Sequence, residues 1–466
     1  MLFSSNLFLF GFLPFVLVVY FLFLAKAPLM WRNGFLFLAS LFFYAWGEPI
    51  YVFLLLGVIF ANWLFALWLT KARSLGLVIA LCFNIGLLFS LKYVAFFITT
   101  LNQVTGWQLN VPEKTLPIGL SFFLFQAISY VVDVRRGLCQ AAKNPCEVGL
   151  YLAFFPQLAA GPIVRYNSIA AQIKMRHHCW QDISAGLCRF LVGLGAKVLL
   201  ADQLTDVVDK AFALAAGQRT DLAILMAWLG AIAFMLQIYF DFVGYSHMAI
   251  GLARVFGFYL PENFRQPYSA SSITDFWRRW HISLSSWLRD YIYILLGGSR
   301  VGGKSRLAFN LLIVWLVSGF WHGANWTYVL WGLFFYILLL IEKWSGFTAK
   351  MPTWLSRSYT LLAVLFSWIL FRSENISSAI FYYKALFGLA GNAWTNDYAA
   401  FYSQEYGFYL VLAILFTTPF WAWLQNHLVK QEYLALVVVP CLLFIFFLTV
   451  SYLVKGSYNP FIYFQF

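Results

Sequence analysis

YVFLLLGVIFANWLFALWLTKARSLGLVIALCFNIGLLFSLKYV, residues 51–94, consists of two long apolar runs separated by the short basic segment Lys71-Ala72-Arg73. A helix needs about 20 apolar residues to cross the hydrocarbon core of a bilayer, and each run is about that long. The stretch therefore predicts two consecutive transmembrane helices joined by a short charged connection.

The same pattern continues on both sides of this stretch. Of the 466 residues, 62% are hydrophobic and only 11% are charged, whereas about a quarter would be charged in a soluble domain. Hydropathy gives candidate spans at 5–25, 31–46, 50–70, 75–98, 117–134, 184–200, 222–243, 307–320, 327–341, 359–371, 406–424 and 433–454. Some are short or polar, so we expect roughly ten or eleven true spans. The sequence predicts an all-α, polytopic membrane protein in which 1–466 form one membrane domain.

The net charge of +13 raises the question of a nucleic-acid partner. Its distribution favours a topological role, because basic residues lie at alternate connections between the predicted spans. If the N-terminus is outside, three basic clusters fall on the cytoplasmic side, as the positive-inside rule requires. These clusters are Lys26 with Arg32, Lys71 with Arg73, and Arg135 with Arg136. We expect no nucleic-acid partner.

The segment from Gly298 to Ser305 matches G-x-x-x-x-G-K-S, the pattern of a phosphate-binding P-loop. A P-loop follows a buried strand and opens a helix that faces phosphate. Here a membrane-surface helix is predicted before the segment and a bilayer span after it. The match is therefore interpreted as a glycine-rich, positively charged cytoplasmic loop and not as a nucleotide-hydrolysing site.

Polar features concentrate in the middle of the chain. In FWRRWHISLSSWLRDYIYILLGG, residues 276–298, Trp277, His281, Leu284 and Leu288 recur on one face of a helix. The segment fits an interfacial amphipathic helix with a buried, hydrogen-bonded histidine as well as it fits a functional site.

A second histidine interrupts a long apolar run in VSGFWHGANWTYVLWG, residues 317–332. His322 stands between Gly319 and Gly323 and is bracketed by Trp321 and Trp326. A histidine at such a break can act as a neutral base, and the alternative is a structural histidine that donates to a backbone carbonyl. The surrounding glycines favour a site.

A third polar segment, MLQIYFDFVGYSHMAIG at residues 235–251, contains Asp241 and His247 on an otherwise apolar stretch. The carboxylate is expected to pair with one of the arginines, and a proton relay is the alternative. No metal site is predicted, because the six cysteines form no C-x-x-C pair and no H-E-x-x-H motif occurs.

Four segments together resemble the membrane-bound O-acyltransferase family, in particular its bacterial polysaccharide branch. They are LPIGLSFFLFQAISYVVDVRRG, AAGPIVRY, DFWRRWHISLSSWLRDYIYILLGG and FWHGANWTYVLWG. The matching block, approximately 116–332, is expected to be the catalytic core, and the flanks 1–98 and 359–466 match only as hydrophobic helices. The resemblance departs from the branch at 241–250, where Val243 and His247 replace a serine and a second aspartate.

The resemblance implies re-entrant helices around a funnel-like tunnel that holds two histidines. His322 would be the catalytic residue, and His281 would line the tunnel and support catalysis. The expected lining or supporting residues are Trp277, Trp280, Trp321, Asn325, Trp326 and Asp241.

The implied reaction moves an acetyl group from cytoplasmic acetyl-CoA, a substrate and not a bound cofactor, across the bacterial inner membrane. Arg300, Lys304 and Arg306 would contact its phosphates. The expected acceptor is an extracytoplasmic polysaccharide, alginate-like by first preference, with cellulose and peptidoglycan as alternatives. A periplasmic SGNH-type O-acetyltransferase partner is expected to complete the transfer. Two other classes stay open from the residues alone: a proton-coupled transporter or channel, and a non-catalytic scaffold of an export complex.

Overall fold

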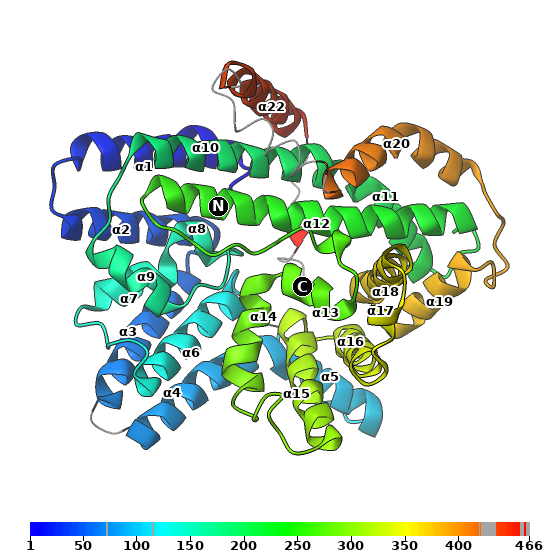
Figure 1. Cartoon of the computed structure of the whole chain (residues 1–466), viewed down its shortest axis with the longest axis horizontal. Helices are drawn as coiled ribbons and strands as arrows, with labels where there is room; N and C mark the ends of the chain where they lie inside the picture. The colour runs from blue at the N-terminus through cyan, green and yellow to red at the C-terminus, as the bar shows by residue number, and fades with distance from the viewer. Residues whose placement is uncertain (71–72, 114–115, 419, 421–434, 457–460, 463–466) are drawn as a thin grey trace. The chain divides into compact units, whose positions relative to one another are not determined.

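The computed structural model describes residues 1–466 except 71–72, 114–115, 419, 421–434, 457–460 and 463–466. All regular structure in these described residues is helical, as the sequence predicts (Figure 1). Eight helical segments are long and apolar enough to cross a membrane, which makes the chain a multi-pass membrane protein. They are Tyr51–Leu69, Ser74–Thr105, Trp180–Ala216, Ile224–Val255, Trp326–Ser345, Thr353–Arg372, Asp397–Thr417 and Val437–Lys455.

The chain divides into two compact units, and the helices α10, α12 and α22 each have residues in both. Unit 1 consists of Met1–Leu194, Tyr245–Glu262 and Val450–Gln465. Its helices are η1 (Phe8–Phe12), α1 (Leu13–Val18), η2 (Val19–Phe23), α2 (Leu29–Gly47), α3 (Tyr51–Leu69), α4 (Arg73–Leu88), η3 (Phe89–Tyr93), α5 (Val94–Thr105), α6 (Leu120–Arg136), α7 (Pro145–Ala153), α8 (Phe155–Leu158), α9 (Tyr166–Lys174) and α10 (Trp180–Gly195).

Unit 1 contains two of the four motif segments. The first forms the buried helix α6, which packs on α3 and α4. The second, residues 159–166, follows the one-turn helix α8 as a largely buried non-helical stretch and ends at Tyr166, the first residue of α9. Non-helical backbone at membrane depth has to be sheltered by protein, and this stretch is sheltered in that way.

Unit 2 consists of Gly195–Gly244 and Asn263–Thr449. Its helices are η4 (Ala196–Ala201), η5 (Asp202–Leu204), α11 (Thr205–Ala216), α12 (Ile224–Val255, shared), η6 (Pro267–Ser269), α13 (Ile273–Arg279), α14 (Ile282–Leu288), η7 (Arg289–Tyr293), α15 (Lys304–His322), α16 (Trp326–Ser345), α17 (Phe347–Lys350), α18 (Thr353–Arg372), α19 (Ile376–Leu386), α20 (Asp397–Thr417) and α22 (Ala435–Lys455).

Two glycines bring α15 and α16 into close backbone contact. A Cβ atom on Gly319 would collide with the carbonyl oxygen of Tyr328, and one on Gly332 would collide with the carbonyl oxygen of Trp315. Small residues permit this approach between membrane helices. Gly332, the last residue of the FWHGANWTYVLWG segment, and Gly319, just before the segment, therefore set the crossing of α15 and α16 that positions His322.

Candidate functional site

A helical hairpin in unit 2 carries both candidate histidines at one end and the basic loop at the other. His281 immediately precedes α14, which continues through η7 to the loop, and α15 runs back from Lys304 to His322 (Figure 1). The buried Asn310 of α15 fastens the loop by donating to the carbonyl oxygens of Leu296 and Gly298, each at 3.1 Å. The fold thus places two histidines that are far apart in sequence at the same end of one hairpin.

His281 lies between α13 and α14 in a left-handed backbone conformation, with φ 44° and ψ 54°. This conformation is uncommon for a residue other than glycine and is held only by surrounding contacts. The anchor is Asn263, whose carbonyl oxygen accepts from the backbone N–H of Ile282 at 2.9 Å. The turn therefore aims the imidazole of His281 inward, where the residue is 1% exposed.

The side chain of Asn263 also fixes the tautomer of His281. Its Oδ1 accepts from the backbone N–H of Ser283 at 3.2 Å and from the Ser283 hydroxyl at 2.9 Å. The His281 Nδ1 lies 3.2 Å from the same oxygen, so it must carry the proton and donate. Burial lowers the pKa of His281 to about 3, which keeps the ring neutral with its lone pair on Nε2.

His322 is the last residue of α15 and is 5% exposed. Three aromatic rings surround its imidazole. The ring centroids of Trp321, Trp331 and Phe371 lie 5.0, 4.9 and 5.2 Å from that of His322, all in edge-to-face geometry. Such walls exclude water from the imidazole.

The two histidines meet at one tryptophan. The ring of Trp321 lies 5.7 Å from that of His281 and 5.0 Å from that of His322. Unit 2 therefore brings together the three residues on which the sequence interpretation depends most.

The two tryptophans before His281 belong to the same aromatic cluster. Trp277 packs edge-to-face on Trp331 with ring centroids 5.5 Å apart. Trp280 packs on Trp368 at 5.0 Å, and Trp368 stacks on Trp331 at 6.2 Å. Helix α18, which supplies Trp368 and Phe371, lies outside the core predicted at 116–332, so the buried site extends further along the chain than that block.

Asn325 and Trp326 lie at the start of α16. The Asn325 side chain caps the helix by accepting from the backbone N–H of Thr327 at 3.1 Å, and it donates to the carbonyl oxygen of Glu374 at 2.8 Å. Asn325 therefore joins the start of α16 to the connection that follows α18. Trp326 is 44% exposed, in contrast to the buried Trp321.

Asp241 pairs with a lysine and not with one of the arginines considered from the sequence. The Nζ of Lys197, in η4, lies 3.0 Å from Asp241 and 2.7 Å from Asp202. Both Lys197 and Asp241 are buried, and the pair ties η4 to α12. The next residue of α12, Phe242, contacts the ring of His281 at 4.7 Å, which links this cluster to the histidine.

Arg300, Lys304 and Arg306 lie at the opposite end of the hairpin from the histidines. Lys304 begins α15 and His322 ends it, which separates them by about 27 Å along the helix axis. The loop follows the helical segment η7, and the described residues contain no strand, so the local structure is not that of a P-loop. A donor bound at this loop would need an extended arm to reach His322.

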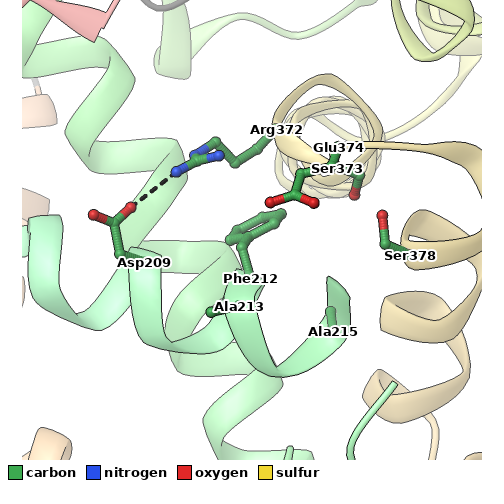
Figure 2. A pocket seen from close by; sticks show the side chains of 8 residues that line it. All are labelled: Asp209, Phe212, Ala213, Ala215, Arg372, Ser373, Glu374 and Ser378. Carbon is green, nitrogen blue, oxygen red and sulfur yellow. Dashed lines mark hydrogen bonds and ion pairs between the residues drawn. The ribbon is translucent and has the colours of Figure 1, made fainter. Parts of the chain in front are cut away.

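A polar pocket of about 220 Å³ lies near the histidine end of the hairpin (Figure 2). It is lined by Asp209, Phe212, Ala213, Ala215, Arg372, Ser373, Glu374 and Ser378. Arg372 donates to Asp209 at 2.9 Å across it. The residue before Arg372 is Phe371, which contacts His322, and Asn325 binds the backbone of Glu374, so the pocket borders the site. Within the described residues, no three His, Cys, Asp or Glu side chains are grouped to hold a metal.

Sequence reasoning missed five residues that complete the site: Asn263, Lys197, Trp331, Trp368 and Phe371. A lysine in the apolar run at 184–200 was a usable signal, because an intramembrane cation is costly and needs a partner. The aromatic residues carried no such signal, since aromatic residues are frequent throughout this chain.

Comparison with known proteins identifies relatives across most of the chain. The family model of the membrane-bound O-acyltransferases (MBOAT) matches residues 75–383. The probable alginate O-acetylase AlgI of Pseudomonas syringae is 42% identical over 399 residues, which cover 83% of this chain and 75% of the relative. The peptidoglycan O-acetyltransferase of Helicobacter pylori is 37% identical over 84% of this chain and 80% of its own length. The teichoic acid D-alanyltransferase of Bacillus subtilis is 26% identical over 53% of this chain and 65% of its own length.

Proposed function

The chain belongs to the membrane-bound O-acyltransferase family, and from this membership we propose that it transfers an acetyl group from cytoplasmic acetyl-CoA to an extracytoplasmic acceptor. The O-acyltransferase class follows from the family. One observation supports the proposed chemistry. The rings of His281 and His322 both contact the ring of Trp321, in a buried aromatic cluster at the end of one hairpin.

His322 acts as the general base. It takes the proton of the attacking hydroxyl while the new O–C bond to the acetyl carbon forms, an effect worth about 10²–10⁴ in rate. When the tetrahedral intermediate collapses, the C–S bond of the thioester breaks and the same proton passes to the departing thiolate. The buried aromatic walls of Trp331 and Phe371 exclude competing water.

His281 supports this step and stays neutral. Its Nδ1–H is committed to Asn263, and its ring contacts Trp321, the immediate neighbour of His322. The role is to hold Trp321, and hence the end of α15, in position.

The charges at the two ends of the helices in unit 2 favour one orientation. One end carries Arg300, Lys304 and Arg306 before and within the first turn of α15, and Lys343, Lys350 and Arg357 around the connection from α16 to α18. The opposite end, at residues 323–325 and 373–375, carries only Glu374, next to Arg372. By the positive-inside rule the basic end is cytoplasmic, so acetyl-CoA arrives at the basic loop.

The acceptor arrives from the other end, where Arg372 and Glu374 line the pocket of Figure 2. Phe371, just before Arg372, contacts His322, and Asn325 donates to the carbonyl oxygen of Glu374. Relatives that are named as acting on alginate and on peptidoglycan support a polysaccharide as the final acceptor in the inner membrane of a bacterium. We infer that the acetyl group passes through a serine of a periplasmic SGNH-type partner before it reaches the glycan, with an alginate-like polymer as first choice.

The test is to replace His322 by alanine in the purified, detergent-solubilised protein. We expect acetyl transfer from acetyl-CoA to fall by about 10²-fold or more, with normal membrane insertion and a cooperative thermal unfolding transition. His177→Ala, at an exposed histidine of unit 1, is the matched control and should keep full activity. Full acetylation by a folded His322→Ala variant would refute the assignment. Solute flux in proteoliposomes without an acyl donor would favour a transporter.

A further inference from the structure

Three tryptophans of the cluster around His322 have an indole N–H that meets no acceptor among the described residues. They are Trp277, Trp331 and Trp368. Trp331 and Trp368 are 0% and 1% exposed, so solvent does not reach their N–H groups either. A buried donor without an acceptor costs folding free energy, and such groups in native proteins call for a specific explanation.

The rings around Trp331 supply no oxygen acceptor for its N–H. They belong to Trp277, Trp315, His322, Phe335, Trp368 and Phe371, none of whose side chains carries an oxygen. Of the three unpartnered indoles, Trp331 is the one whose ring contacts His322, at 4.9 Å between centroids. A group that accepts a hydrogen bond from the Trp331 N–H would therefore lie beside His322, the proposed base.

We infer that the indole N–H of Trp331 binds the carbonyl oxygen of the acyl thioester and stabilises the oxyanion that forms there. The inference rests on the proposed function, since it requires an acyl group next to His322. Attack of the hydroxyl oxygen on the carbonyl carbon moves the C=O π electron pair onto oxygen, and this charge is what the N–H donor meets. When the intermediate collapses, that pair re-forms C=O as the C–S bond breaks and the thiolate takes the proton from His322.

A fixed donor in a dry aromatic cluster suits this role for a physical reason. Hydrogen bonds to a developing charge are stronger where water is excluded, and a donor already held in place needs no reorganisation during the reaction. Trp331 is held by the packing of rings from α13, α15, α16 and α18. The indole offers the donor without adding a charge that would titrate.

The experiment replaces the indole of Trp331 by benzothiophene, using site-specific incorporation of 3-benzothienylalanine, which keeps ring size and removes the N–H. Trp331→Phe is the simpler second variant. We expect kcat for acetyl transfer to fall by about 10²–10³-fold with little change in KM, as when one oxyanion donor is removed from other acyl-transfer enzymes. The ¹³C=O stretch of bound [1-¹³C]acetyl-CoA should shift to higher frequency when the hydrogen bond is lost.

The matched control is the same benzothiophene substitution at Trp228, in α12. The indole N–H of Trp228 donates to the carbonyl oxygen of Leu386 at 3.1 Å, and its ring packs on Phe366 and Phe387 and not on His322. We expect less than a tenfold change there. An unchanged kcat and an unchanged carbonyl stretch in the Trp331 variant, with His322→Ala still inactive, would overturn the inference and leave the proposed function intact. Activity retained by His322→Ala would refute the proposed function itself.

Discussion

Asn263 determines the position of His281 through several hydrogen bonds. It binds the backbone after His281, the imidazole of His281 and both donors of Ser283. These contacts hold a histidine in a backbone conformation that its side chain disfavours. The position of His281 is therefore set by a residue 18 positions earlier in the chain.

Replacing Asn263 by alanine should disturb both stability and catalysis. Buried donors of His281 and Ser283 would lose their acceptor, at a cost of about 2–3 kcal/mol in the free energy of unfolding. A small displacement of His281 and Trp321 should lower acetyl transfer by about 10²-fold. Asn263→Asp keeps an acceptor and should recover part of the activity. Thermal unfolding and turnover with acetyl-CoA check this, and two equally active variants would contradict it.

His281 should also leave a signature in the pH dependence of stability. Its pKa in the folded protein is lowered to about 3 by burial, against an ordinary value near 6.5, so the unfolded state binds the proton more readily between these values. Stability is then fully present above about pH 6.5 and is lost as the pH falls toward 3.

We expect His281→Asn to flatten this acid limb when the unfolding midpoint is measured from pH 7 to pH 4. His177→Asn, at an exposed site, should retain the slope of the parent protein. Parallel pH profiles of the unfolding midpoint for the parent and His281→Asn would show that protonation of His281 does not cause the loss of stability in acid.

At the scale of elements, one cluster of buried charges joins η4 to α12. Lys197 bonds to Asp241 and Asp202 where the helix changes from α to π geometry and then to a short 3₁₀ turn. Removing one partner of a buried ion pair leaves an uncompensated charge, which costs about 3–5 kcal/mol. The cluster supports the helix that carries Phe242 against His281.

Lys197→Met should therefore lower the free energy of unfolding by about 3–5 kcal/mol. Adding Asp241→Asn should restore part of the loss, because it removes one of the two stranded carboxylates. Lys350→Met, at an exposed lysine, is the control and should be neutral. A Lys197→Met protein as stable as its parent, by denaturant or thermal unfolding, would contradict a supporting role.

The helices show where sequence patterns succeed and where they stop. The predicted span 327–341 corresponds to α16 (Trp326–Ser345), which is one of the eight candidate spans. Residues 307–320 do form a helix, α15 (Lys304–His322), but it is not among those eight. The span predicted at 222–243 ends too early, because α12 continues to Val255 through His247 and Arg254. Hydropathy stops at polar residues, but the helix continues because these residues find partners: Arg189 donates to His247, and Arg254 pairs with Asp182.

At the scale of the whole molecule, the membrane class, the helical fold and the histidine motifs could be predicted from the sequence. The partners of these motifs could not. For Asp241 the sequence suggests one of the arginines as partner, but the structure shows Lys197 beside it. Lys304 is expected to contact the phosphates of the acyl donor, and the structure adds that the full length of α15 separates it from His322. Local sequence patterns indicate where helices lie along the chain. Which distant residues pair, and how far apart two sites lie, depends on tertiary packing.

The proposed orientation of unit 2 can be tested by cysteine accessibility. In a variant without the six native cysteines, Gly302→Cys reports on the basic loop and Ile376→Cys on the connection after α18. Open space surrounds Gly302 and Ile376 is exposed, so both changes should be tolerated. A membrane-impermeant maleimide should label Ile376→Cys in intact spheroplasts, and Gly302→Cys only after permeabilisation. Labelling of both before permeabilisation would contradict the assignment.

The close crossing at Gly319 and Gly332 has a consequence for how acyl specificity could change. Because backbone touches backbone there, α15 and α16 cannot spread apart to admit a bulkier acyl chain without breaking that contact. The wall on the other side of His322 is built by Phe371, from a different helix. In laboratory evolution, the preferred length of the acyl chain should therefore change through substitutions to smaller residues on α18. The glycines at the crossing of α15 and α16 should stay unchanged.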